Sequence, residues 1–295
     1  MSAHALCLVG GNLSQPKIDS LQASLKGRGL SVQGQKWLSP GKALDLYLGV
    51  EGPTRGLIDG VRRALPSVDV ALVPLEGRRK QLLVADMDST LIPSESIVEM
   101  AAIAGVEAAV ANLTNQAMRG RIDFAEALMD RVKLLKGLEA EAVAALGHQT
   151  DFSPGAEILC ATMRAAGARL VLVSGGFTLI SGVVAARLGM HHHVSNTLAL
   201  ISGRLTGGLE LPLIDAAMKA EVLADELQAQ RLEASDALAV GDGANDLAMI
   251  GLAGLGVAYQ GKAPVQAAAD ACINHTDLST LLYFQGYTEA EFVTP

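Results

Sequence analysis

One stretch of the chain decides its fold: Leu82-Leu83-Val84-Ala85-Asp86-Met87-Asp88-Ser89-Thr90. Four apolar residues followed by a polar turn are typical of a buried parallel strand, and open α/β sheets place their ligands at the carboxyl ends of such strands. Nothing in folding requires two carboxylates at that end. The pair Asp86 and Asp88 therefore indicates a site for a divalent cation.

The composition supports the same class of fold. Half of the 295 residues are hydrophobic, only 3% are aromatic, and alanine is abundant. Such a core is aliphatic, with alanine-rich helices packed closely on a sheet. The length suits one main domain with one or two accessory units. We therefore predict an α/β protein with a Rossmann-like parallel sheet.

The net charge and the first residues of the chain argue against nucleic acid and membranes as partners. The net charge of -8 argues against binding nucleic acid through a clustered basic surface. Residues 1–6 hold no basic segment or long apolar signal region, and no later apolar run reaches the roughly 18 residues needed to cross a bilayer. We therefore expect a cytoplasmic protein with no membrane partner. Cys7, Cys160 and Cys272 lack metal-ligand spacing, so we expect reduced thiols.

The first part of the chain reads as a separate domain. Residues 4–75 alternate short apolar runs with helix-like patterns in the order β-α-β-β-α-β, which predicts a ferredoxin-like α+β domain over residues 1–75. This unit is similar to ACT-type domains, which implies either a site for a small amino acid or a packing and dimerisation module. A homodimer is possible, although no pattern predicts one. Residues 76–80, Glu-Gly-Arg-Arg-Lys, are typical of a solvated linker or a domain boundary.

The remaining residues, 81–295, read as a catalytic domain. A helical pattern over about 94–150 follows the first strand and predicts an inserted cap. From residue 169 onward, strand-like runs alternate with alanine-rich helices, which indicates a parallel sheet built from right-handed crossovers. Residues 195–209, with a Ser-Gly turn at 202–203, predict a hairpin.

Polar groups end three of the predicted parallel strands. They are Asp86 and Asp88, then the run Ser174-Gly175-Gly176, then the run Asp242-Gly243-Ala244-Asn245-Asp246. The carboxyl ends of parallel strands meet at one edge of a sheet, and Lys219 lies near the start of an intervening helix. Carboxylates, a hydroxyl, glycine amides and a lysine together suit a phosphoryl group held with a hard cation.

The spacing of these groups suggests a reaction. Asp86 and Asp88 are two residues apart and can point the same way, so that one attacks phosphorus while the other protonates the leaving oxygen. Mg²⁺ takes one or two protein carboxylates together with a substrate phosphate, and Asp86 and Asp242 fit that demand. The groups that would neutralise the other phosphate oxygens are Ser174, the amides of Gly175 and Gly176, and Lys219.

These motifs, in this order, resemble the four motifs of the haloacid dehalogenase superfamily. The resemblance covers roughly residues 81–280 and rests on Asp86-Met87-Asp88-Ser89-Thr90, Ser174, Lys219 and the run 241–246. Taken alone, a residue such as Ser174 is usually a turn or a helix cap. The resemblance implies that Asp86 is the nucleophile, that Asp88 is the general acid and base, and that Mg²⁺ binds to Asp86, the backbone carbonyl of Asp88, and Asp242. For Asp246, two roles stay open: it could orient Lys219, or it could orient a metal-bound water.

The predicted cap carries two candidates for substrate specificity. Phe124, Leu128, Arg131 and Leu135 share one helical face, so Arg131 interrupts an apolar stripe. Arg131 could hold a planar carboxylate, or its stem could pack on the core while its head reaches water. Glu95 opens the first cap helix, where it could bind an ammonium group or simply favour the helix N-terminus.

Within the superfamily, this combination is similar to the phosphoserine phosphatase family. The similarity rests on Asp86 to Thr90 followed by Glu95, then Met118, Phe124 and the segment from Arg131 to Gly137. It implies hydrolysis of O-phospho-L-serine, the last step of serine biosynthesis. The implied substrate-binding residues are Glu95, Met118, Phe124, Arg131, Ser174, Gly175, Lys219 and Asn245. Two alternatives remain: phosphoryl transfer to another small alcohol such as homoserine, and a regulatory protein that senses an amino acid through residues 1–75.

Overall fold

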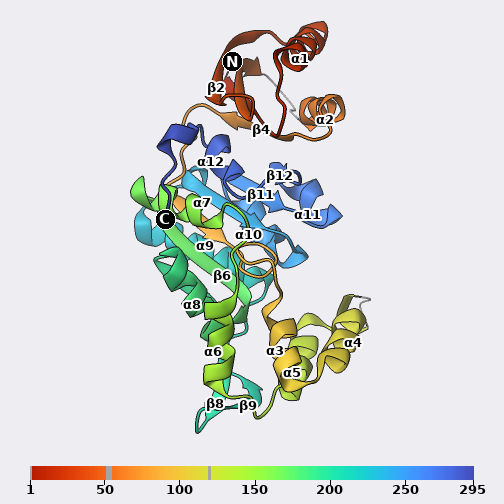
Figure 1. Cartoon of the computed structure of the whole chain (residues 1–295), viewed down its shortest axis with the longest axis vertical. Coiled ribbons are helices and arrows are strands. Elements are labelled where there is room, and N and C mark those ends of the chain that lie inside the picture. Colours follow the sequence, from red (N-terminus) through yellow and green to blue (C-terminus); the bar gives the residue numbers. More distant parts are fainter. Residues whose placement is uncertain (1, 51–54, 119–120) are drawn as a thin grey trace.

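The computed structural model describes residues 2–50, 55–118 and 121–295 (Figure 1). The N-terminal module consists of β1 (Ser2–Val9), α1 (Gln15–Gly27), β2 (Val32–Ser39), β3 (Ala43–Val50), α2 (Arg55–Ala64) and β4 (Asp69–Pro74). Its strands lie in the order β2-β3-β1-β4, and neighbouring strands are antiparallel. Both helices pack on one face, where Ile18 and Val61 meet Leu6, Leu8 and Leu46. The predicted ferredoxin-like order is confirmed.

The catalytic domain is built on six parallel strands. They are β5 (Leu82–Ala85), β6 (Arg169–Phe177), β7 (His192–Asn196), β10 (Ala237–Gly241), β11 (Leu255–Tyr259) and β12 (Ala271–Ile273). The order β12-β11-β10-β5-β6-β7 places β5 between the two other strands that carry motifs. This confirms the predicted α/β fold.

Helices cover both faces of this sheet. They are α7 (Ala156–Ala165), α8 (Thr178–Leu188), α9 (Ala216–Gln230), α10 (Leu247–Leu252), α11 (Ala263–Ala268) and α12 (Thr280–Phe284). Successive side chains of β5 point to opposite faces, as a strand requires. Leu82 and Val84 join the cluster with α9 and α10, whereas Leu83 and Ala85 join the cluster with α7 and α8. The apolar run is buried on both sides because it is the centre of a two-sided core.

Four helices follow β5 and fill the range predicted for the cap: α3 (Ser96–Ala104), α4 (Glu107–Met118), α5 (Phe124–Leu134) and α6 (Ala140–Gln149). In Figure 1, α3, α4 and α5 stand apart from the sheet, whereas α6 packs beside α8. The predicted hairpin is present as β8 (Leu198–Ile201) and β9 (Arg204–Leu209), and β9 packs on α5. Its turn residues, Ser202 and Gly203, both have positive φ, as a two-residue hairpin turn favours.

The N-terminal module and the catalytic domain share one continuous sheet of ten strands. Strand β4 pairs antiparallel with β12 through Val70 and Cys272. Beside that pair, the buried carboxylate of Asp69 accepts hydrogen bonds from the backbone N–H groups of Asn274, His275 and Thr276. The module is therefore packed against the catalytic domain. An amino-acid-binding role for it stays a prediction.

The prediction that residues 76–80 are solvated is wrong for two of the basic side chains. Arg78 forms a paired contact with the buried carboxylate of Asp45, with N–O distances of 2.6 and 2.8 Å, and it also donates to the carbonyl of Phe284. Lys80 is buried and donates to the carbonyls of Gly77 and Ser235. Basic residues can be buried where each charge has hydrogen-bonding partners, and a charge count alone does not reveal such partners.

Substituting Arg78 by Ala should lower the free energy of unfolding by about 3 kcal/mol, because it leaves Asp45 buried and unpaired. Arg79 provides the matched control, since its ion pair with Glu291 is exposed. Arg79→Ala should cost about 1 kcal/mol or less. Chemical denaturation of both variants measures the difference, and equal losses would contradict a special contribution from the buried pair.

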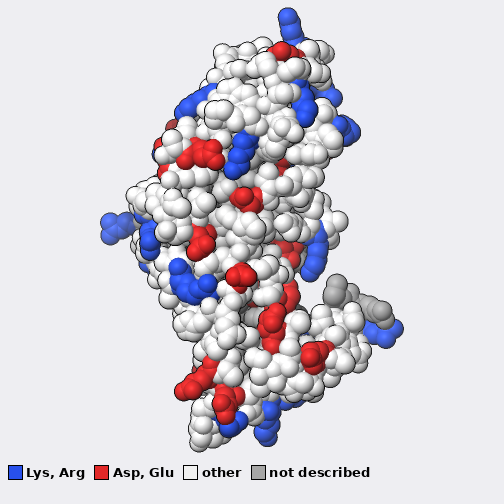
Figure 2. Space-filling view, viewed as in Figure 1, with Lys and Arg blue, Asp and Glu red and all other residues white. Residues whose placement is uncertain are grey.

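Cys7, Cys160 and Cys272 are buried and free, as expected for reduced thiols. Within the described ranges, no helix is both long enough and apolar enough to cross a membrane. On the face shown in Figure 2, acidic and basic side chains are interspersed, and several acidic ones lie where the cap joins the sheet domain.

Candidate active site

A cavity of about 550 Å³ lies between the carboxyl ends of the central strands and the first three cap helices. The predicted site residues that line it are Asp86, Asp88, Glu95, Arg131, Ser174, Gly175, Asp242 and Asn245. Lys219 and Asp246 lie beneath its floor and are fully buried. The side chains of Met118 and Phe124 fall outside the described part of the chain. The structure thus gathers residues separated by more than 150 positions around one cavity.

Lys219 is the central cation of the floor. It lies in the first turn of α9. The N-cap residue of this helix is Asp215, whose side chain accepts a hydrogen bond from the Met218 N–H. The Lys219 Nζ donates to Asp86 Oδ1 and to Asp246 Oδ1, both at 2.6 Å. Burial opposes a charge on Lys219, but these two carboxylates outweigh it and raise the pKa of the lysine. Burial raises the pKa of Asp86 well above its usual range, against the attraction of Lys219.

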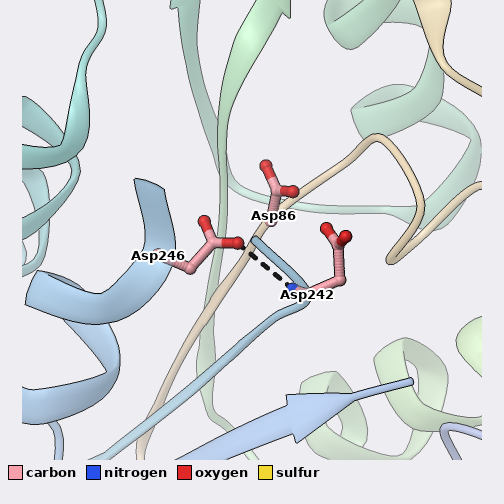
Figure 3. Close-up of side chains that lie close together, drawn as sticks. All are labelled: Asp86, Asp242 and Asp246. Atoms are coloured by element: carbon pink, nitrogen blue, oxygen red, sulfur yellow. Dashed lines mark hydrogen bonds between the residues drawn. The ribbon is translucent and has the colours of Figure 1, made fainter. Parts of the chain in front are cut away.

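Asp246 holds Lys219 with one oxygen and the neighbouring loop with the other. Its Oδ2 accepts hydrogen bonds from the N–H groups of Asp242, at 3.1 Å, and Gly243, at 2.9 Å. Figure 3 shows the Asp246 side chain reaching back toward the Asp242 backbone. A side chain at Gly241 would come within 2.4 Å of the Asp246 carboxylate, so only glycine fits there. This packing orients the lysine toward Asp86.

Three carboxylates form a cluster that can hold a metal ion. Ligand atoms of Asp86, Asp242 and Asp246 lie within 4.8 Å of one another (Figure 3). Burial, with the nearby charge of Asp246, raises the pKa of Asp242 to about 6. The Asp242 carboxylate receives no hydrogen bond from any residue the structure describes, whereas both oxygens of Asp246 are occupied. Asp86 and Asp242 therefore offer the carboxylate oxygens that a hard divalent cation prefers.

Asp88 is set up for proton transfer. Its carboxylate accepts hydrogen bonds from the N–H group and the hydroxyl of Ser96, at 3.2 and 2.8 Å. Burial and the nearby charge of Glu95 raise the pKa of Asp88 to about 7, against these hydrogen bonds. A group that titrates near neutral pH can both donate and accept a proton there.

The cap contributes one cation and one anion to the cavity. Arg131 donates from Nε to the Ala127 carbonyl at 3.0 Å and from Nη1 to the Thr114 hydroxyl at 3.3 Å. Among the described residues, it forms no salt bridge with a carboxylate. Burial lowers the pKa of Arg131, against the attraction of Glu95. Glu95 in turn accepts a hydrogen bond from the hydroxyl of Ser89. Arg131 thus keeps part of its guanidinium available to an anion from solution.

Sequence reasoning missed three residues of this site. Ser96 holds Asp88, and Asn196 donates to the Gly175 carbonyl at 2.8 Å while its own carbonyl accepts from the Ile214 N–H. Lys262 lines the cavity and lowers the pKa of Asp242, although less strongly than burial raises it. Lys262 follows β11, so applying the strand-end argument to a fourth strand would have found it. Ser96 and Asn196 follow no spacing rule.

The sheet topology, the cap and this catalytic set define a class of hydrolase. The family model of haloacid dehalogenase-like hydrolases matches residues 83–251, which is more than half of the chain. The chain belongs to this family.

Individual relatives narrow the class. The phosphoserine phosphatase SerB2 of Mycobacterium tuberculosis is 35% identical over 298 residues, covering 98% of this chain and 73% of the relative. A crystal structure of a hydrolase of the same family from Salmonella enterica serovar Typhi has a TM-score of 0.85, with 27% identity over 98% of this chain and 99% of the other. A structure of a phosphoaspartyl intermediate analogue of phosphoserine phosphatase has a TM-score of 0.65. It is 35% identical in sequence, and the match covers 70% of this chain and 99% of the other. These matches group the chain with the phosphoserine phosphatases of the family.

Proposed function

We propose that this chain is a phosphoserine phosphatase, which hydrolyses O-phospho-L-serine to L-serine and phosphate as the last step of serine biosynthesis. One observation carries the proposal. Glu95 and Arg131, both from the cap, face the same cavity as Asp86 and Asp88. An amino-acid phosphate carries an ammonium group that matches Glu95 and a carboxylate that matches Arg131. Its phosphate would lie at Asp86 and Asp88.

The cap residues bind the amino-acid part of the substrate. Arg131 has a planar guanidinium with unused donors, which suits a carboxylate held by two parallel hydrogen bonds. Glu95 pairs with the ammonium group. A role for Met118 and Phe124 in the apolar part of the pocket stays a prediction, because their side chains lie outside the described part of the chain. Two of the relatives described above support the proposal, because one is named a phosphoserine phosphatase and the other is a structure of phosphoserine phosphatase.

The sheet residues carry out the phosphoryl transfer in two steps. Asp86 attacks phosphorus to form an acyl phosphate, while the bond from phosphorus to the serine oxygen breaks and Asp88 gives that oxygen its proton. Asp88 then takes a proton from the water that attacks phosphorus, which releases phosphate and restores Asp86. Charge on the phosphate oxygens is met by Ser174, the Gly175 amide, Lys219 and Asn245.

A divalent cation completes this charge balance, and we propose that it is Mg²⁺. Asp86, Asp242 and the backbone carbonyl of Asp88 would hold it, with Asp246 behind them. When bound, it would neutralise charge on the phosphate and on the clustered carboxylates. The half-buried carboxylate of Asp242 supports this assignment, because it accepts no hydrogen bond from the described residues and a cation would offset the cost of burying its charge.

A panel of phosphate esters tests the proposal. Phosphate release is measured with phosphoserine, with ethanolamine phosphate, which lacks the carboxylate, and with 3-phosphooxypropionate, which lacks the amine. We expect kcat/KM for phosphoserine to exceed the others by about 10²-fold, because each analogue lacks one of the two charged groups that Glu95 and Arg131 would bind. A chelator should abolish release, and added Mg²⁺ should restore it. Equal rates on all three esters would refute the roles of Glu95 and Arg131, and activity in chelator would refute the metal.

The cytoplasmic location of the protein and its assembly into a homodimer stay predictions. Sedimentation of the purified chain at several concentrations measures the oligomeric state directly. A mass of one chain at every concentration would refute the dimer.

A further inference from the structure

The loop between β5 and α3 is closed by two side-chain contacts. Ser96 donates its hydroxyl and its N–H to the carboxylate of Asp88, and Ser89 donates its hydroxyl to Glu95 at 2.8 Å. Residues 88 and 89 therefore pair with residues 96 and 95. We call these four residues, Asp88, Ser89, Glu95 and Ser96, the clasp. It joins the acid and base to a carboxylate that faces the substrate cavity.

The backbone of Ser89 points to a role for its hydroxyl. Ser89 has a φ of 58°, in the left-handed region, and its N–H donates to the Ser94 carbonyl at 3.3 Å. A residue with a side chain rarely adopts this conformation, which glycine adopts at less cost. Strained residues of this kind are concentrated at functional sites. Here the conformation brings the hydroxyl to Glu95.

The other half of the clasp is held tightly against the sheet. Ser96 is buried, with 2% of its surface exposed. A Cβ atom at Gly176, at the end of β6, would lie 3.0 Å from the Ser96 hydroxyl and 3.1 Å from Asp88 Oδ2. The pair formed by Asp88 and Ser96 therefore has little freedom to move.

We propose that Ser89 and Ser96 are positioning residues that link recognition of the substrate ammonium to the placement of the acid and base. Ser89 holds Glu95 for the ammonium, and Ser96 holds Asp88 for the leaving oxygen. Because residues 95 and 96 are neighbours at the start of α3, a shift of one moves the other. This inference rests on the proposed phosphoserine phosphatase function.

Two alanine variants separate the two halves of the clasp. The readout is kcat and KM for phosphoserine and for 3-phosphooxypropionate. Ser89→Ala should lower the ratio of kcat/KM between the two esters about tenfold, mainly through KM, because a hydrogen bond to a charged group is lost. Ser96→Ala should lower kcat about tenfold for both esters with a smaller change in KM. A merely structural role would not split kcat from KM in this way.

Two further variants serve as controls. Ser94→Ala makes the same chemical change in the same loop, at a hydroxyl with no hydrogen bond among the described residues, and should keep the wild-type ratio. Ser89→Gly also removes the hydroxyl, but it relaxes the left-handed backbone. If the hydroxyl is what matters, the ratio of kcat/KM between the two esters should fall in Ser89→Gly by the same factor as in Ser89→Ala. Recovery of the wild-type ratio in the glycine variant would overturn the role of the hydroxyl.

The double variant Ser89→Ala with Ser96→Ala tests the link itself. In linked residues, the combined loss in kcat/KM differs from the product of the single losses. A combined loss equal to that product would overturn the link. If the wild-type chain does not prefer phosphoserine over 3-phosphooxypropionate, the proposed recognition of the substrate ammonium by Glu95 is wrong, and with it the proposed specificity for phosphoserine. If it does, and Ser89→Ala behaves like Ser94→Ala, only the present inference is wrong.

Discussion

Replacing Asp86 by Asn is expected to lower kcat by about 10⁴-fold or more, the scale of loss seen when a catalytic nucleophile is removed. The amide has nearly the same shape as the carboxylate, but it cannot attack phosphorus to form an acyl phosphate. The variant should still fold, because Lys219 keeps Asp246 as a partner at 2.6 Å. The loss is therefore expected in the chemical step and not in the amount of folded protein.

A single-turnover experiment with phosphate-labelled substrate follows the intermediate directly. After an acid quench, label should remain on the wild-type protein and be absent from Asp86→Asn. Asp88→Asn is the matched control, since it removes a carboxylate two residues away and keeps the nucleophile. It should still take up label from p-nitrophenyl phosphate, whose leaving group needs little protonation. Label on Asp86→Asn, or a kcat within about tenfold of wild type, would show that Asp86 is not the nucleophile.

Strand-end reasoning predicted the floor of the cavity because its geometry is regular. Side chains that follow parallel strands must converge at one edge of the sheet, so Asp86, Ser174 and Asp242 could be grouped from sequence alone. The contact between Ser96 and Asp88 could not be predicted in this way. It depends on how one irregular loop closes, including the left-handed conformation of Ser89, and neither follows a period.

The relation between the two modules was also beyond the sequence pattern. The order of elements within residues 1–75 follows from local periodicity, but the pairing of β4 with β12 joins residues about 200 positions apart. The burial of Arg78 likewise depends on Asp45 and on the carbonyl of Phe284, which are distant in sequence. A basic run is normally solvated, so its partners have to be seen before its burial can be predicted.

Replacing Lys219 by Met should lower the free energy of unfolding by about 4 kcal/mol near neutral pH, because two buried carboxylates lose their shared cation. The raised pKa of Lys219 means that its contribution is fully present below its unfolded pKa and is lost only in strong base. Lys219 opposes the effect of burial on the pKa of Asp86, so removing it raises that pKa further. The folded state of the variant then binds more protons than the unfolded state, by a wider margin than in the wild type. The stability of the variant should therefore fall as pH rises through that pKa.

Chemical denaturation in chelator, at about pH 5 and about pH 8, checks this sign: the deficit of Lys219→Met relative to wild type should be larger at the higher pH. Lys262→Met is the control for stability, because Lys262 is exposed and faces the same cavity. Activity should fall about 10³-fold in Lys219→Met, since the phosphate oxygens and the nucleophile lose a fixed positive charge. A variant as stable as wild type at the higher pH would mean that Asp86 and Asp246 share a proton, and that Lys219 is not needed to hold them together.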